Sequence, residues 1–139
     1  MGTGQLLILE QLGKALADVC RNYSPRPLLI ASSDMNHYED DATTRVKDRK
    51  AIEKILTLDA RGLHATVIKE SISMCGFAPT VAVLAAAVEL GATKADLVQY
   101  ATSGDVSGDL QTVVGYAGLV IQRTTWLPPT VAARAPGSR

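Results

Sequence analysis

Cysteines and aromatic residues are scarce in this sequence. Cys20 and Cys75 are the only cysteines, which is too few for a disulfide framework and suits free thiols in a reducing compartment. The aromatic residues are four Tyr, one Phe and one Trp among 139 residues, so the hydrophobic core must be mainly aliphatic. We therefore expect a cytoplasmic protein that folds without disulfide bonds.

The sequence also lacks an excess of charge of one sign and a long hydrophobic run. Its 14 basic side chains balance 14 acidic ones, so no one-sided positive field is available to attract nucleic acid or an anionic membrane. The longest apolar stretch, 78–90, includes Pro79 and Glu89 and is too short to span a bilayer. Neither nucleic acid nor a membrane is expected as a partner.

The pattern of apolar residues predicts one α/β domain. Helices are expected over 5–22, 44–56 and 79–91, with a shorter helix that Asp59 caps. We expect residues 1–123 to form the domain and 124–139, which end in a run rich in Pro, Ala and Gly, to form a flexible tail. Strands are expected over 28–31, 97–102 and 115–122.

Two predicted helices carry apolar residues at helical spacing, which is typical of a face turned toward the core. In helix 44–56 that stripe includes Val46, and in helix 5–22 we assign Cys20 to packing. The stripe predicted for helix 5–22 consists of Ile8, Leu12, Ala15, Leu16 and Val19.

The predicted sheet is thin. The run 28–31 is apolar at every position, which indicates a strand that is buried on both faces and has a neighbour on each side. Three strands cannot provide such an environment easily. We therefore expect that part of the sheet is missing from this chain.

Asp34 and His37 are the first candidates for chemistry. They follow the apolar run 28–31, and ligands of open α/β sheets gather beyond the carboxyl ends of strands. A carboxylate three residues before an imidazole can orient the ring for general acid–base work or for metal binding. The spacing also fits an alternative without a functional role, in which Asp34 caps a turn and His37 lies on the surface.

Cys75 is the second candidate. It precedes the helix that starts near Pro79, where free backbone N–H groups and the helix dipole favour a thiolate. Such a thiolate could bind a metal or act as a nucleophile with His37 as its base, whereas the alternative is a small buried side chain. His64 has no ligand-like neighbour at helical spacing and is interpreted as structural or exposed.

Two polar segments are interpreted as ordinary connections. The loop 104–109 alternates oxygen-bearing residues like a calcium loop, but Tyr116 stands where the closing bidentate acid should be. It is therefore predicted to be a tight connection between two strands. The acidic run 39–41 is typical of a solvated loop.

Four motifs, taken in order, resemble the Memo family, which is also called AmmeMemoRadiSam system protein B. The resemblance covers about residues 1–122. The motifs are Leu-Leu-Ile-Ala-Ser-Ser-Asp-Met-Asn-His-Tyr (28–38), Asp-Arg-Lys-Ala-Ile (48–52), Ser-Met-Cys-Gly-Phe-Ala-Pro (73–79), and Tyr-Ala-Thr-Ser-Gly-Asp-Val-Ser-Gly-Asp (100–109) with Val-Gly-Tyr-Ala (114–117).

The resemblance implies a fold similar to class III extradiol dioxygenases, with a mixed central sheet flanked by helices. It places Cys75 at the position of a metal ligand, His37 at that of the pocket acid/base, and Asp34 beside it as a pocket acid. It implies a metal-binding, dioxygenase-like pocket that takes iron, copper or zinc and has a redox role in the full-length form. An alternative is a non-catalytic module that binds a small molecule or a peptide in the same pocket.

Members of that family are about twice as long as this chain, and the resemblance puts two further histidine ligands in the preceding half. We therefore expect Met1 to be an internal start or the edge of a truncated gene model. With Cys75 as the only ligand of that set, the pocket is incomplete, and we expect this chain to hold no metal tightly. The exposed sheet edge predicts self-association, or pairing with the absent half.

Overall fold

The computed structural model describes residues 3–124, so all but the first residue of the expected tail 124–139 lies outside the described residues. The α/β class is confirmed. The elements are α1 (Thr3–Asn22), β1 (His37–Glu39), α2 (Asp41–Leu56), α3 (Ala60–Lys69), α4 (Phe77–Glu89), β2 (Lys94–Thr102), α5 (Gly104–Ser107) and β3 (Val113–Gln122).

The sheet has three strands within the described residues, in the order β1-β3-β2, and both pairs are antiparallel. β2 pairs with β3 over its whole length, from Lys94 opposite Gln122 to Thr102 opposite Gly115, with one irregularity between Leu97 and Gln99. β1 covers only the first residues of β3. Most of the outer edge of β3 therefore has no partner strand in the part of the chain described.

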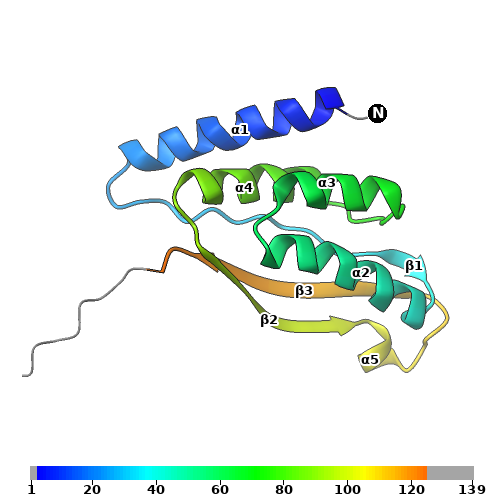
Figure 1. The fold of residues 1–139 in the computed structure, drawn as a ribbon. Helices are drawn as coiled ribbons and strands as arrows, with labels where there is room; N and C mark the ends of the chain where they lie inside the picture. Colours follow the sequence, from blue (N-terminus) through cyan, green and yellow to red (C-terminus); the bar gives the residue numbers. More distant parts are fainter. Residues whose placement is uncertain (1–2, 125–139) are drawn as a thin grey trace, which may run out of the picture.

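Helices α1 to α4 are stacked on one side of the sheet (Figure 1). α2 packs on β2 and β3, α3 and α4 follow, and α1 lies outermost against α4. The core between these layers is aliphatic, as expected, and its largest fully buried apolar side chains are Leu63, Val81, Leu84 and Val113. None of the helices over residues 3–124 is long and apolar enough to cross a membrane.

The apolar stripe predicted for α1 faces solvent instead of the core, so this prediction was wrong. Ile8 is 65% exposed and Val19 is 52% exposed, whereas Ala17 is fully buried. The reason is the close approach of α4: a Cβ on Gly13 would lie 2.7 Å from the Cβ of Ala85, so small residues have to form the contact. Cys20 is buried, as its predicted packing role requires.

The predicted strand 28–31 is absent, and this prediction was wrong. Leu28 and Ile30 are 84% and 77% exposed, and no backbone–backbone hydrogen bond within residues 3–124 involves this segment. Apolar side chains alone do not make a strand, because each strand needs a neighbouring backbone that accepts and donates its hydrogen bonds. The first strand is instead β1, which lies in the polar segment that follows.

The acidic run 39–41 is not a solvated loop, which corrects the prediction. Glu39 ends β1, and the side chain of Asp40 accepts a hydrogen bond from the backbone N–H of Thr43, which caps α2. α2 therefore starts three residues earlier than predicted. Its inward face also differs, since Val46 is 58% exposed while Asp48 has no exposed surface.

The connection between β2 and β3 holds the short helix α5, which the sequence did not predict. Gly108 ends this turn with φ of 77°, a conformation that favours glycine. The segment links the two strands, as expected.

Asp59 caps α3, as predicted, and provides the first test of the fold. Its side chain accepts a hydrogen bond from the backbone N–H of Gly62 at 2.7 Å. We expect Asp59→Ala to lower the free energy of unfolding by about 1 kcal/mol because one N–H loses its acceptor. Urea denaturation measures the change. Asp59→Asn keeps a capping oxygen and should stay close to the parent; equal losses for both variants would contradict the capping role.

Candidate metal and acid–base site

Asp34, His37 and Cys75 lie together at one end of the molecule. One ligand atom of each residue lies within 4.8 Å of the others. Asp34 belongs to the segment that leads into β1, His37 begins β1, and Cys75 lies in the turn before α4. The fold thus brings a carboxylate, an imidazole and a thiol from two distant stretches of sequence to one point. Their chemical roles stay predictions.

The thiol of Cys75 makes polar contacts with the segment that leads into β1. The backbone N–H of Asp34 donates to Sγ at 3.3 Å, and the hydroxyl of Ser33 lies 3.9 Å from Sγ. Cys75 is exposed and lies two residues before Phe77, the first residue of the 13-residue helix α4. The N–H of Asp34 thus holds the sulfur on the side of the turn that faces Asp34 and His37.

Gly76 allows the turn of Cys75 to approach the segment of Asp34. A Cβ at this position would overlap the backbone oxygen of Ser32 and lie 2.7 Å from the Cβ of Ser33. The N–H of Gly76 also donates to the hydroxyl of Ser33 at 2.8 Å. The contact between the two segments therefore depends on the missing side chain.

The ring of His37 is held in one orientation by Ser73. Nδ1 lies 2.6 Å from the backbone oxygen of Ser73, and because a carbonyl only accepts, this nitrogen must carry the proton. The backbone N–H of His37 donates to the hydroxyl of Ser73 at 2.7 Å. Nε2 keeps a free lone pair when the ring is neutral, and it lies 3.7 Å from Oδ2 of Asp34. It is the nitrogen available for a proton or a ligand.

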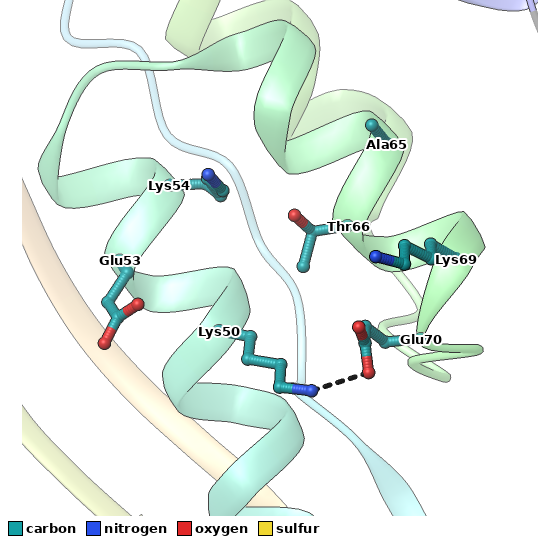
Figure 2. Close-up of a pocket in the computed structure, with 7 residues that line it drawn as sticks. All are labelled: Lys50, Glu53, Lys54, Ala65, Thr66, Lys69 and Glu70. Atoms are coloured by element: carbon teal, nitrogen blue, oxygen red, sulfur yellow. Dashed lines mark hydrogen bonds and ion pairs between the residues drawn. The ribbon is translucent and has the colours of Figure 1, made fainter.

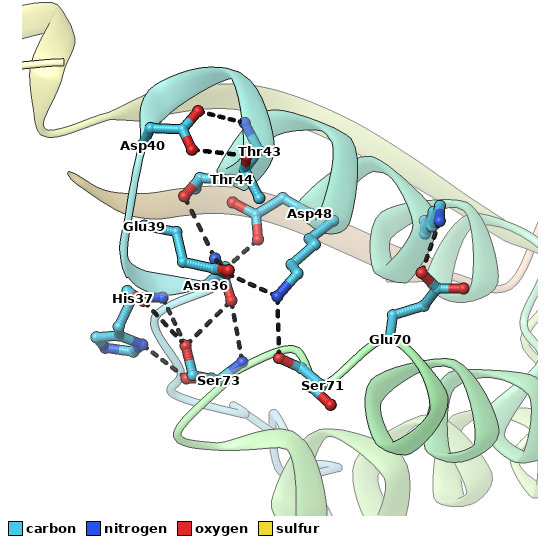
Figure 3. Close-up of polar contacts among 12 residues, drawn as sticks. Asn36, His37, Glu39, Asp40, Thr43, Thr44, Asp48, Glu70, Ser71 and Ser73 are labelled. Carbon is cyan, nitrogen blue, oxygen red and sulfur yellow. Dashed lines mark hydrogen bonds and ion pairs between the residues drawn. The ribbon is translucent and has the colours of Figure 1, made fainter. Parts of the chain in front are cut away.

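Asn36 connects the two segments, and sequence reasoning missed it (Figure 3). Its amide oxygen accepts from the N–H and the hydroxyl of Ser73 at 3.1 and 3.0 Å. Its amide nitrogen donates to Glu39 at 2.6 Å and to Thr44 at 3.3 Å. Asn36 has no exposed surface, so these bonds fix the register of Ser73 against His37.

Asp48 holds the backbone of Asn36, and sequence reasoning missed this residue too. One carboxylate oxygen accepts the backbone N–H of Asn36 at 2.8 Å, and the other accepts the hydroxyl of Tyr100 at 2.7 Å. Burial raises the pKa of Asp48, and burial together with this carboxylate raises the pKa of Tyr100. The sequence held one signal, because Asp48 lies four residues before Ile52, on the inward face of α2.

Glu39 and Lys47 close the outer side of this network. Lys47 Nζ lies 2.7 Å from Glu39 Oε2, and the hydrogen bonds from Lys47 and Asn36 lower the pKa of Glu39. Lys47 also donates to the backbone oxygen of Ser71 at 3.3 Å, which ties the stretch before Ser73 to α2. This ion pair and the hydrogen bonds of Asn36 and Asp48 together hold the segment that carries His37.

Two pockets on the surface are lined by other residues than Asp34, His37 and Cys75. One, of about 230 Å³, lies between α2 and α3 and is spanned by an ion pair of 2.7 Å between Lys50 and Glu70 (Figure 2). The other is an apolar groove of about 510 Å³ that reaches Ser33, next to the site. His64, interpreted as structural or exposed, is 5% exposed and packs near the ring of Phe77.

Comparisons with known proteins identify the family. The model of the family "Memo-like protein" matches residues 1–120 of this chain. The chain belongs to the Memo-like family. The resemblance seen in the four motifs is therefore confirmed for the family.

Archaeal relatives show how much of a Memo-like protein this chain represents. A MEMO1 family protein of Methanopyrus kandleri is 42% identical over 123 residues, which are 88% of this chain and 44% of the relative. A relative in Pyrobaculum aerophilum is 45% identical over 114 residues, 82% of this chain and 41% of the relative. The Memo-like chain thus spans less than half the length of these curated relatives.

Proposed function

We propose that this Memo-like chain supplies one wall of a metal-binding, dioxygenase-like pocket with a redox role in the full-length form. Cys75 would be the metal ligand, and His37 with Asp34 would handle protons beside it. The observation that carries the proposal is the convergence of the thiol, the imidazole and the carboxylate within 4.8 Å.

The donor set suits a transition metal. Thiolate and imidazole ligands favour zinc, iron or copper over magnesium or calcium. The sulfur of Cys75 is exposed, so an ion there has room for ligands from outside this chain, as the family resemblance implies. A bound ion would act as a Lewis acid toward substrate oxygen atoms.

His37 and Asp34 provide the proton chemistry in this proposal. Because Nδ1 donates to Ser73, Nε2 accepts a proton from a substrate hydroxyl in the pocket. The carboxylate of Asp34, 3.7 Å away, stabilises the positive ring that results. Asp34 is the more exposed partner, with 49% of its side chain accessible against 16% for His37, so it also faces an incoming ligand.

Cobalt(II) titration tests the metal site. We expect a thiolate-to-cobalt charge-transfer band that appears only at high Co²⁺ concentration and is lost on desalting, because one thiolate with two neighbours of looser geometry holds the ion weakly. Cys75→Ser should abolish the band, and His37→Ala should weaken it.

Cys20→Ser is the matched control, since Cys20 is buried in α1 and lies outside the site. This variant should give the parent spectrum. A band that survives Cys75→Ser would overturn the assignment of the ligand. One ion per chain that withstands desalting would overturn the expected weak binding.

A further inference from the structure

The segment that leads into β1 and the turn before α4 are hydrogen-bonded to each other at two places. At one, Ser73 bonds to Asn36 and to His37 (Figure 3). At the other, Ser33 and the backbone of the next residue contact the turn of Cys75. Because the first place already holds the imidazole, the bonds at the second place are the ones that act on the thiol.

The hydroxyl of Ser33 binds the turn of Cys75 through the backbone of Gly76. It accepts a hydrogen bond from the N–H of Gly76 at 2.8 Å and donates one to the backbone oxygen of Asp34 at 2.7 Å. That N–H belongs to the rigid, planar peptide unit that joins Cys75 to Gly76. A hydrogen bond at this N–H therefore fixes the plane from which the side chain of Cys75 projects.

The sulfur itself lies against Ser33 and the backbone of Asp34. The N–H of Asp34 donates to Sγ at 3.3 Å, and the hydroxyl oxygen of Ser33 lies 3.9 Å from Sγ. Because a hydroxyl proton can rotate, Ser33 can also turn its donor from the backbone oxygen of Asp34 to the sulfur. Both contacts keep Sγ on the side of the turn where the carboxylate of Asp34 and the ring of His37 lie within 4.8 Å.

We propose that Ser33 is a positioning residue for the sulfur of Cys75, as Ser73 is for the ring of His37. The proposal rests on the proposed function, since Cys75 is a metal ligand only there. Without the hydroxyl, the buried N–H of Gly76 has no acceptor, and the turn shifts until another group satisfies it. The sulfur then moves away from the imidazole, which keeps its own support.

Hydrogen exchange of the whole chain, followed by NMR, tests this without a metal. The N–H of Asp34 reports the position of the sulfur because Sγ is its acceptor. In Ser33→Ala we expect this amide to exchange about fivefold faster, as the loss of one hydrogen bond predicts, and to approach its rate in Cys75→Ala. The amide of His37, which donates to the hydroxyl of Ser73 at 2.7 Å, should keep the parent rate.

Cobalt(II) titration measures the consequence for the proposed metal site. Since a residue that orients a metal ligand contributes about tenfold or more to affinity, Ser33→Ala should need about tenfold more Co²⁺ to reach half of the charge-transfer band. Ser32→Ala is the matched control, because Ser32 is the exposed neighbour in the chain. Asp59→Ala is a second control, because it weakens the fold at the start of α3, outside the site. Both controls should keep the parent midpoint.

The proposal fails if the amide of Asp34 exchanges in Ser33→Ala as in the parent, because the sulfur then keeps its place without the hydroxyl. An unchanged cobalt midpoint in Ser33→Ala contradicts it as well. If the amide of His37 speeds up equally, or Asp59→Ala moves the midpoint as far, the hydroxyl supports only the fold and the proposal is wrong. A parent chain without a cobalt band would contradict the metal site itself, and the exchange rate of Asp34 would still decide the role of Ser33.

Discussion

Replacing Asp48 with alanine is expected to lower the free energy of unfolding by about 3 kcal/mol, because two polar groups lose their acceptor in the interior. The groups are the backbone N–H of Asn36 and the hydroxyl of Tyr100, which bond to the carboxylate at 2.8 and 2.7 Å. Asn36 in turn holds Ser73 and, through it, His37. Urea denaturation gives the loss, and the chemical shifts of the His37 ring report the displaced site.

Asp48→Asn is the informative companion variant. Its amide oxygen still accepts from Asn36, and the hydroxyl of Tyr100 can rotate to accept from the amide nitrogen, so we expect a smaller loss. The raised pKa of Asp48 sets the pH dependence. The contribution of this carboxyl to stability is complete below its unfolded pKa and declines as pH rises through the folded value. Asp48→Asn should therefore gain stability relative to the parent as pH rises above the ordinary Asp pKa of about 4.

A constant stability difference between the parent and Asp48→Asn across that range would contradict the assigned burial effect. An alanine variant as stable as the parent would show that the network around Asn36 does not hold the fold.

Gly115→Ala is expected to be the other severe change, with a loss of about 2–3 kcal/mol from overpacking. A Cβ at this position would overlap the carboxylate of Asp48 and lie 3.2 Å from the Cβ of Met35. Gly115 also pairs with Met35 and Asn36 through its backbone, so the methyl group would push β3 away from the candidate site. Thermal or urea unfolding measures the loss.

Gly118→Ala is the matched control on the same strand. A Cβ at Gly118 would meet nothing within 4 Å, so the change should be neutral, or stabilise by about 0.5–1 kcal/mol through a less flexible unfolded chain. Similar losses at both positions would show that a methyl group at either glycine of β3 destabilises the strand. The loss at Gly115 would then not come from the contact with Asp48.

The elements that could be predicted from the sequence are those whose signals are local. α3 has its capping Asp59, α4 has Pro79 in its first turn, and β2 and β3 are apolar segments bounded by polar turns. The start of α3 depends on a hydrogen bond between residues three apart in sequence, and β2 and β3 are neighbours joined by one connection. These elements appear close to where they were expected, with ends that differ by a few residues.

The wrong predictions have one cause. The sequence of a helix or strand does not show which other part of the chain packs or pairs with it. α1 has apolar residues on two faces, and only the contact of Gly13 with α4 decides which face is buried. The run 28–31 has the composition of a strand but no neighbouring backbone in the described chain. β1 is short and polar, yet it forms because the start of β3 lies beside it.

The amino-acid sequence by itself determined the α/β class, the family and the residue types Asp34, His37 and Cys75 as candidates, because motifs and periodicity are properties of the chain alone. The tertiary structure decided that these three meet, and that Asn36, Asp48 and Ser73 hold His37 in place. The physical reason is that a buried polar group needs a partner, and that partner can lie far along the chain, as Tyr100 lies 52 residues from Asp48.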